Sequence, residues 1–201
     1  GFRSRGLRER LHIDESLNNL GSRGGVRFAG FTVPFPGTVN TYDRFDAENT
    51  FYGGQLGFRT FFQRGPLSLS ITGKAAVGVT QQLVVVDGGT ILRAGNGRPV
   101  AGIPGGVLAV GSNMGRHFDN HFSVIPEGAA DLAYELTDRL IVKVGYTFIW
   151  WSSVARPGNA LDRTVNPGLV PGDAAFGTPG PNRPSFQFGR EGFWAQGANI
   201  G

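Results

Sequence analysis

Three features of the sequence predict an all-β fold, an antiparallel up-and-down barrel of the membrane-spanning class. Residues 122–151 alternate between apolar and polar side chains like a long hairpin, and each arm exceeds the roughly 9–11 tilted residues that cross a bilayer. Short turns and long Gly- and Pro-rich loops alternate strictly between the expected strands. No apolar run of about 18 residues occurs, which excludes a helical span.

Composition restricts the other classes. The 201 residues include 33 Gly, 12 Pro and 16 Phe, and this aromatic content argues against a disordered chain. The net charge of +4 comes from scattered Arg residues, so the sequence does not indicate a partner nucleic acid. Because the chain has no Cys, disulfides, thiolate metal sites and Cys nucleophiles are excluded.

The first expected strand covers residues 2–14, in which apolar and charged residues occupy opposite parities. A loop rich in Gly, Asn and Pro is expected at 15–48, with an extended piece at 26–33. The apolar parity of the first strand consists of Leu7, Leu11 and Ile13, and the polar parity of Arg8, Arg10, His12 and Asp14.

Two further strands are expected at 51–63 and 67–83, joined by the turn Arg64-Gly65-Pro66. Both alternate with a period of two, as strands with one apolar and one polar face do. The apolar sets are Tyr52, Leu56, Phe58 and Phe62 in the first, and Leu67, Leu69, Ile71, Ala75, Val77 and Val79 in the second.

The hairpin at 122–151 supplies strands four and five, with a turn at 136–139. Long loops are expected at 87–119 and 155–191, and a sixth strand at 193–200. Even positions of the hairpin are apolar: Phe122, Val124, Ala130, Leu132, Tyr134, Leu140, Val142, Val144, Tyr146, Phe148 and Trp150. Odd positions are polar: Ser123, Glu127, Asp131, Glu135 and Lys143.

The loop asymmetry matches outer-membrane barrels, which have short periplasmic turns and longer external loops. The turns at 64–66 and 136–139 would then lie on the periplasmic side, where the chain would also begin and end. Six strands fall short of the about eight of the smallest single-chain barrels. We therefore expect residues 1–201 to form a single β-barrel domain that is a fragment of a larger barrel, truncated at both ends.

Several segments resemble one known family: FYGGQLGFR (51–59), VGSNMGRH (110–117), the long stretch from VIPEGAADLAYELT to RTVNP (124–167) and RPSFQFGREGFWAQGANIG (183–201). They are similar to the C-terminal portion of the planctomycete-type putative outer-membrane beta-barrel porin family. The most specific pieces are YTFIWWSSVARPG (146–158) and FWAQG (193–197). The resemblance implies an outer-membrane β-barrel whose transported substrate is not assigned.

Five charged residues are expected to face the barrel lumen, because a cation facing lipid at mid-depth costs roughly 2–4 kcal/mol. They are Arg59, Lys74, Glu127, Asp131 and Lys143. Two interpretations stay open for them. They set the ion preference of a channel, or they pair with one another inside a filled barrel.

Four aromatic residues near the strand ends are expected to form an interfacial girdle at headgroup level. They are Tyr134, Tyr146, Trp150 and Trp194. Trp151 has the opposite parity to Trp150, so at most one of the two faces lipid. The alternative for these aromatics is an ordinary soluble core.

No catalytic residue, cofactor or metal ligand set is predicted. His117 and His121 form an HxxxH pattern, but it lies where a loop enters a strand, and Asp119 is the only further ligand nearby. Glu127 and Asp131 lie about 13 Å apart along one strand face, too far for a glycosidase pair. The sequence therefore does not predict an enzyme.

The favoured function is a porin-like passive channel in the bacterial outer membrane. Its expected partners are outer-membrane lipid and either further copies of the chain or other envelope proteins, with no nucleic acid. One alternative is a structural or surface-interaction barrel whose lumen is plugged by the long loops. Another is a soluble β-barrel that binds an apolar ligand.

Overall fold

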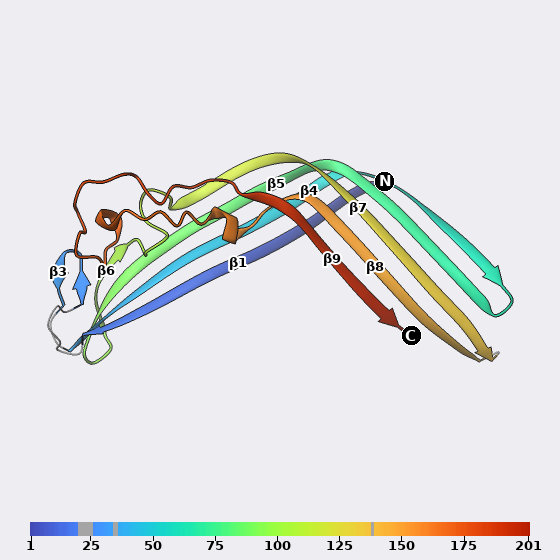
Figure 1. The fold of residues 1–201 in the computed structure, drawn as a ribbon, viewed down its shortest axis with the longest axis horizontal. Helices are drawn as coiled ribbons and strands as arrows, with labels where there is room; N and C mark the ends of the chain where they lie inside the picture. Colours follow the sequence, from blue (N-terminus) through green and yellow to red (C-terminus); the bar gives the residue numbers. More distant parts are fainter. Residues whose placement is uncertain (20–25, 34–35, 138) are drawn as a thin grey trace.

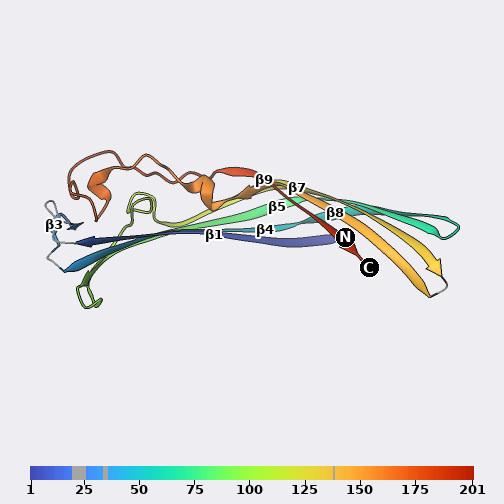
Figure 2. The same cartoon turned by 60° about the horizontal axis from the view of Figure 1, so that its bottom comes forward.

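The computed structural model describes residues 1–19, 26–33, 36–137 and 139–201, and these residues form one large antiparallel sheet that curls without closing (Figures 1 and 2). Its strands run in the order β1-β4-β5-β7-β8-β9, with β6 paired beside β5. The principal strands are β1 (Phe2–Asn19), β4 (Gly37–Arg64), β5 (Leu67–Ala94), β7 (Gly115–Thr137), β8 (Leu140–Ala155) and β9 (Arg190–Ile200).

Small elements occupy the long connections. The strands β2 (Arg27–Phe28) and β3 (Phe31–Thr32) form a tiny hairpin, whose two turn residues Ala29 and Gly30 have φ values of 51° and 81°. The extended piece expected at 26–33 is therefore interrupted by a turn, and only 27–28 and 31–32 are strand. The remaining elements are β6 (Pro99–Pro104) and the 3-10 turns η1 (Pro157–Ala160) and η2 (Pro167–Leu169). No helix in the described part of the chain is long and apolar enough to cross a membrane.

The all-β antiparallel prediction is confirmed, but several of the expected strand boundaries are wrong. β1 continues to Asn19 and β4 already begins at Gly37, so much of the loop expected at 15–48 is strand. Residues 20–25 and 34–35 of that loop lie outside the described residues, as does Asp138 of the turn predicted at 136–139. Likewise, β5 extends to Ala94 and β7 begins at Gly115, which shortens the loop expected at 87–119.

The strands extend further than expected because, beyond the predicted bounds, one face of the sheet buries a mixture of polar and apolar side chains. In residues 39–51 of β4 the odd positions are buried and the even positions are half-buried or exposed. The odd set mixes apolar with polar residues, so it lacks clean hydrophobic alternation. Its members are Val39, Thr41, Asp43, Phe45, Ala47, Asn49 and Phe51.

The position of β1 also corrects the predicted layout. Phe2 pairs with Gly54, and Asn19 pairs with Gly37, so β1 lies beside the loop-side half of β4. The N-terminus is therefore at mid-sheet, near the bend of the strands in Figure 1, and not beside the short turns. At the other end of the chain, Gly201 hydrogen-bonds with Lys143 near the short turn of the β7–β8 hairpin.

One side of the sheet, the inner face, holds the packed core. β8 leaves β7 after Ile149 and crosses this face, where the backbone of Ala155 reaches Asn49 of β4. Two of the three core clusters lie here. The first is Phe45, Ala47, Val84, Val86, Ala109, Ala155 and Ala160, and the second is Phe51, Ala76, Ile125, Ile149, Trp151 and Val154.

Candidate functional site

The opposite side of the sheet, the outer face, carries a band of exposed apolar side chains next to the short turns. On β4 the band runs from Tyr52 to Phe62, with Leu56 83% exposed and Phe58 65% exposed. These eleven residues span about 25 Å at a tilt of about 45°, which is the height of a barrel's lipid-facing belt. The apolar band consists of Tyr52, Leu56, Phe58, Phe62, Leu67, Ile71, Val77, Val79, Phe122, Leu132, Tyr134, Leu140, Val142, Val144, Tyr146, Phe148, Trp150, Trp194 and Ile200.

The apolar side of β4 changes from the inner to the outer face between Phe51 and Tyr52. Phe51 is fully buried on the inner face, whereas Tyr52 is 44% exposed on the outer face. Beyond this point the outer face of β4 bears polar residues such as Glu48 and Arg44. A single continuous strand therefore meets two environments, and the change of side marks one edge of the apolar band.

Each predicted lumen residue lies on the inner face, at the height of the apolar band. Glu127 joins two cations there: Arg3 Nη2 lies 2.7 Å and Lys74 Nζ lies 3.4 Å from its carboxylate oxygens. Arg3 also donates to Gln55 Oε1 at 2.9 Å. The alternation within each strand predicts the positions of Lys74 and Glu127 on this face, but it does not predict that of Arg3, because the pairing register of β1 cannot be derived from it.

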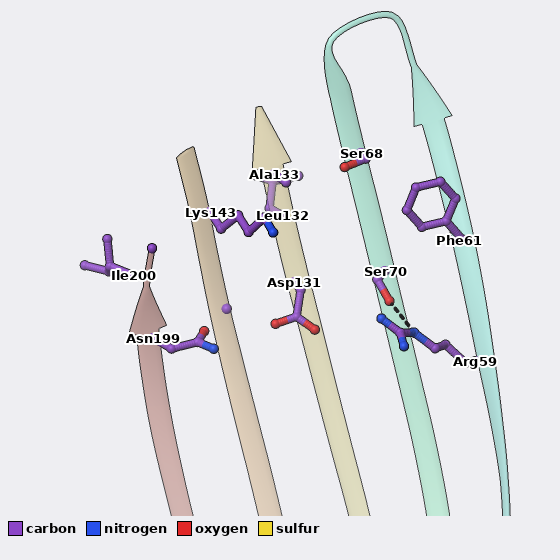
Figure 3. Close-up of a pocket in the computed structure, with 12 residues that line it drawn as sticks. Arg59, Phe61, Ser68, Ser70, Asp131, Leu132, Ala133, Lys143, Asn199 and Ile200 are labelled. Carbon is purple, nitrogen blue, oxygen red and sulfur yellow. Dashed lines mark hydrogen bonds between the residues drawn. The ribbon is translucent and has the colours of Figure 1, made fainter. Parts of the chain in front are cut away.

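The other three predicted lumen residues line a groove near the short turns (Figure 3). The groove has a volume of about 430 Å³ and contains Arg59 from β4, Asp131 from β7 and Lys143 from β8. Arg59 Nε donates to Ser70 Oγ at 2.9 Å. Within the described residues, Arg59, Asp131 and Lys143 form no ion pair, so this part of the inner face presents unneutralised charge to the groove.

The four predicted girdle aromatics lie on the outer face. Trp150 pairs in register with Trp194, whose ring stacks on Phe148 with centroids 6.5 Å apart. Tyr146 donates its hydroxyl proton to Gln196 Oε1, and Tyr134 is 45% exposed. A role of these residues at a membrane interface stays a prediction.

Trp151 points to the inner face, as its parity relative to Trp150 predicts. It is only 2% exposed, its indole N–H donates to Thr80 Oγ1 at 2.9 Å, and its ring meets Phe51 edge-on. The two neighbouring tryptophans therefore occupy opposite surfaces of the sheet.

Residues 105–114 and 156–189, here called the inner cover, pack against the inner face beyond the apolar band (Figures 1 and 2). Asp43, only 2% exposed, accepts backbone N–H groups of Val107, Leu108 and Ala109 at 2.7–3.0 Å. A buried carboxylate that accepts several backbone donors is well satisfied and fixes the loop that supplies them. The sequence treated 105–114 as part of a long external loop and did not predict this attachment.

Two further charged contacts fix the second segment of the inner cover. Arg156 forms a two-pronged contact with Glu9 at 2.8 and 2.9 Å and also reaches Glu191 at 3.0 Å. The hydrogen bonds that Arg156 donates to the Glu9 carboxylate raise the pKa of the guanidinium. Only a bidentate geometry of this kind makes a surface ion pair a reliable anchor.

Asp162 joins the two ends of the irregular segment between β8 and β9. Its carboxylate accepts the backbone N–H of Ser185 at 2.8 Å and the guanidinium of Arg183 at 2.7 Å. These hydrogen bonds hold the pKa of Asp162 well below its ordinary value, the Ser185 N–H having the largest effect and Arg183 the next largest. This segment is consequently held in a fixed shape along the inner face.

The structure gives His117 of the HxxxH pattern a packing role. His117 stacks on Phe186 with ring centroids 3.5 Å apart, and its Nε2 lies 3.0 Å from the carbonyl oxygen of Asn113. In the described ranges, no three His, Cys, Asp or Glu side chains lie close enough to hold a metal ion. His117 instead packs one segment of the inner cover against β7.

An antiparallel sheet with an apolar outer band and a charged inner face defines the wall of a β-barrel with a polar interior. The whole chain, residues 1–201, matches the family described as "Putative beta barrel porin-7", and the protein belongs to this family. No curated protein matches the chain, and no solved structure matches it.

Proposed function

We propose that the protein forms a porin-like passive channel in the bacterial outer membrane. The proposal rests on one observation: at the same height of the sheet, the outer face carries apolar side chains and the inner face carries charged ones. The apolar band covers the outer face there, while Arg59, Asp131 and Lys143 line a groove on the inner face. This arrangement is what lipid outside and water inside require.

The apolar band supports contact with outer-membrane lipid. Contiguous apolar patches beyond a few hundred Å² mark membrane or protein contacts. A soluble barrel would leave this band in water, which is the main argument against a ligand-binding barrel in solution. Where further copies or other envelope proteins associate, the outer face and the sheet edges β1 and β9 are the surfaces they would contact.

The proposal assigns no reaction and no cofactor. Passage would depend on the open part of the inner face, between the short turns and the cluster around Phe51 and Trp151. Charged groups along such a path attract or repel permeating ions, and this is how porin-type channels select.

A structural or surface-interaction barrel with a closed lumen is the second candidate, and the inner cover favours it. The cover packs on the inner face through the contacts of Asp43 and Arg156 and shares an apolar cluster with Phe45 and Val86. If the cover fills the lumen of the assembled barrel, no ion would pass.

Recording from single molecules of the full-length protein in a planar bilayer separates the two candidates. Stepwise, passive current that scales linearly with voltage supports a channel. Folded, membrane-inserted protein without current steps would refute the channel and leave the closed barrel. Resistance of the inserted protein to protease, together with a heat-dependent shift in gel mobility, serves as the control for folding.

A further inference from the structure

We propose that the channel prefers anions and that Arg59 and Lys143 on the inner face determine this preference. The inference rests on the proposed channel function and extends it by assigning the class of permeant. The expected permeants are small hydrated anions, inorganic or carboxylate, that pass the groove of Figure 3.

The first argument is the balance of charge on the open part of the inner face. Strand register places side chains of odd parity on β1, β4, β7 and β8, and of even parity on β5, on this face. Between the short turns and the level of Phe51, the cations among them are Arg3, Arg59, Lys74 and Lys143, and the anions are Glu127, Asp131 and Glu135. This wall therefore carries one positive charge in excess, and Arg5 adds a second at its edge, beside Phe51.

The most enclosed acidic group on this face is already paired with two cations. Glu127, with 19% of its side chain exposed, lies between Arg3 and Lys74, whose combined charge exceeds its own. A cation in transit meets a carboxylate that is already neutralised. The Glu127 network therefore adds to the positive potential and does not offset it.

A further argument concerns the groove itself. Arg59 and Lys143 approach it from opposite sides, and no acidic group described here pairs with either. Asp131 lies between them over the backbone of Gly145, where an added Cβ would come 2.4 Å from its Oδ1. Ser68, Ser70 and Asn199 supply uncharged hydrogen-bonding groups along the same groove.

Together these features place two fixed cations and one fixed anion along the groove. Charge of one sign along a cleft raises the local concentration of the opposite ion. Guanidinium and ammonium groups also donate strong, charge-assisted hydrogen bonds to oxyanions. Anions are thus attracted into the groove and cations are repelled.

The test is the reversal potential of the full-length channel in a gradient of KCl across a planar bilayer. We expect a chloride-over-potassium permeability ratio above unity. Because two charges a few ångströms apart in water interact weakly, reversing one of them should change the ratio by roughly two- to fivefold. Arg59→Glu and Lys143→Glu should each lower the ratio, and Asp131→Asn should raise it.

Arg8→Glu is the matched control, because Arg8 lies on the outer face, opposite Glu48 and away from the groove. It makes the same change of charge and should leave the ratio unchanged. A conducting wild-type channel with a ratio at or below unity overturns the anion inference and leaves the channel function intact. Absence of conductance in folded, inserted protein overturns both. Equal shifts by Arg8→Glu and Arg59→Glu would also refute the role of the groove.

Discussion

Gly53 lies directly opposite Gly78 on β4 and β5, in a contact so close that neither residue has room for a Cβ atom. A Cβ added to Gly53 would come 2.3 Å from the carbonyl oxygen of Val77, and one added to Gly78 would come 2.1 Å from that of Tyr52. The pair lies at the height where the apolar side of β4 changes from the inner to the outer face.

Gly53→Ala should therefore destabilise the fold by about 1–3 kcal/mol, the usual cost of forcing an extra methyl group into a packed site. Gly54→Ala is the matched control, because a Cβ there meets nothing within 4 Å. The measurement is urea unfolding of the detergent-solubilised protein. Equal midpoints for the two variants would show that the close contact at Gly53 does not limit the fold.

Asn49 and Ala155 exchange two hydrogen bonds across the inner face, at 2.9 and 2.7 Å, although β5 and β7 lie between their strands. Asn49→Ala leaves the buried backbone N–H and C=O of Ala155 without these partners, which should cost about 1–3 kcal/mol for each unsatisfied group. Asn120→Ala, on the exposed outer face, should change the unfolding free energy little. The same urea titration measures both variants, and equal losses would contradict the proposed tie.

The neighbouring residues Trp150 and Trp151 should respond in opposite ways to lipids that carry bromine. The chain has three tryptophans, so replacing two of them with Phe leaves a single fluorophore. In bilayers of brominated lipid, the variant that keeps only Trp150 should be strongly quenched. The variant that keeps only Trp151, which is 2% exposed, should be quenched little. Equal quenching of both would mean that the outer face does not meet lipid.

Acid should release the segment that Asp162 holds. Its pKa in the folded protein is depressed, so the carboxylate contributes stability that is present above the ordinary value of about 4 and is lost as the pH falls towards the folded pKa. Protection of the Ser185 amide against hydrogen exchange, measured relative to the intrinsic rate at the same pH, should therefore be high at neutral pH and should fall below about pH 4.

Asp162→Asn should lower the protection of the Ser185 amide at neutral pH and remove the further loss of protection in acid. Asp173→Asn provides the control, since Asp173 accepts only a local N–H from Ala175. If the acid transition persisted unchanged in Asp162→Asn, a titrating group other than Asp162 would be responsible for it.

The part of the fold predicted from the sequence is the part with one apolar and one polar face. In residues 67–79 every second position except Gly73 carries an apolar side chain, so the alternation alone located the strand and its outer face. Arg59, Lys74, Glu127, Asp131 and Lys143 were placed on one face by the same parity, and the structure puts them on the inner face.

What the sequence did not predict lies beyond the apolar band. In residues 39–51 the inner face holds Asp43 and Asn49 together with Phe45, because the inner cover supplies both polar and apolar partners there. These partners come from residues more than sixty positions away, which periodicity along one strand cannot reveal. A change of apolar parity at Phe51–Tyr52 was the available signal, and it marks the edge of the band.

The central claim is that the strands separate lipid from water across the apolar band. The chain has no cysteine, so a nitroxide label can be attached to one introduced Cys at a time along residues 52–62 of the membrane-inserted protein. Collision rates with oxygen, which partitions into lipid, should be high at even positions such as Leu56 and Phe58. Rates with a water-soluble nickel complex should be high at odd positions such as Arg59. If every position collided often with the nickel complex and rarely with oxygen, or if the rates did not alternate with a period of two, the strands would not separate lipid from water.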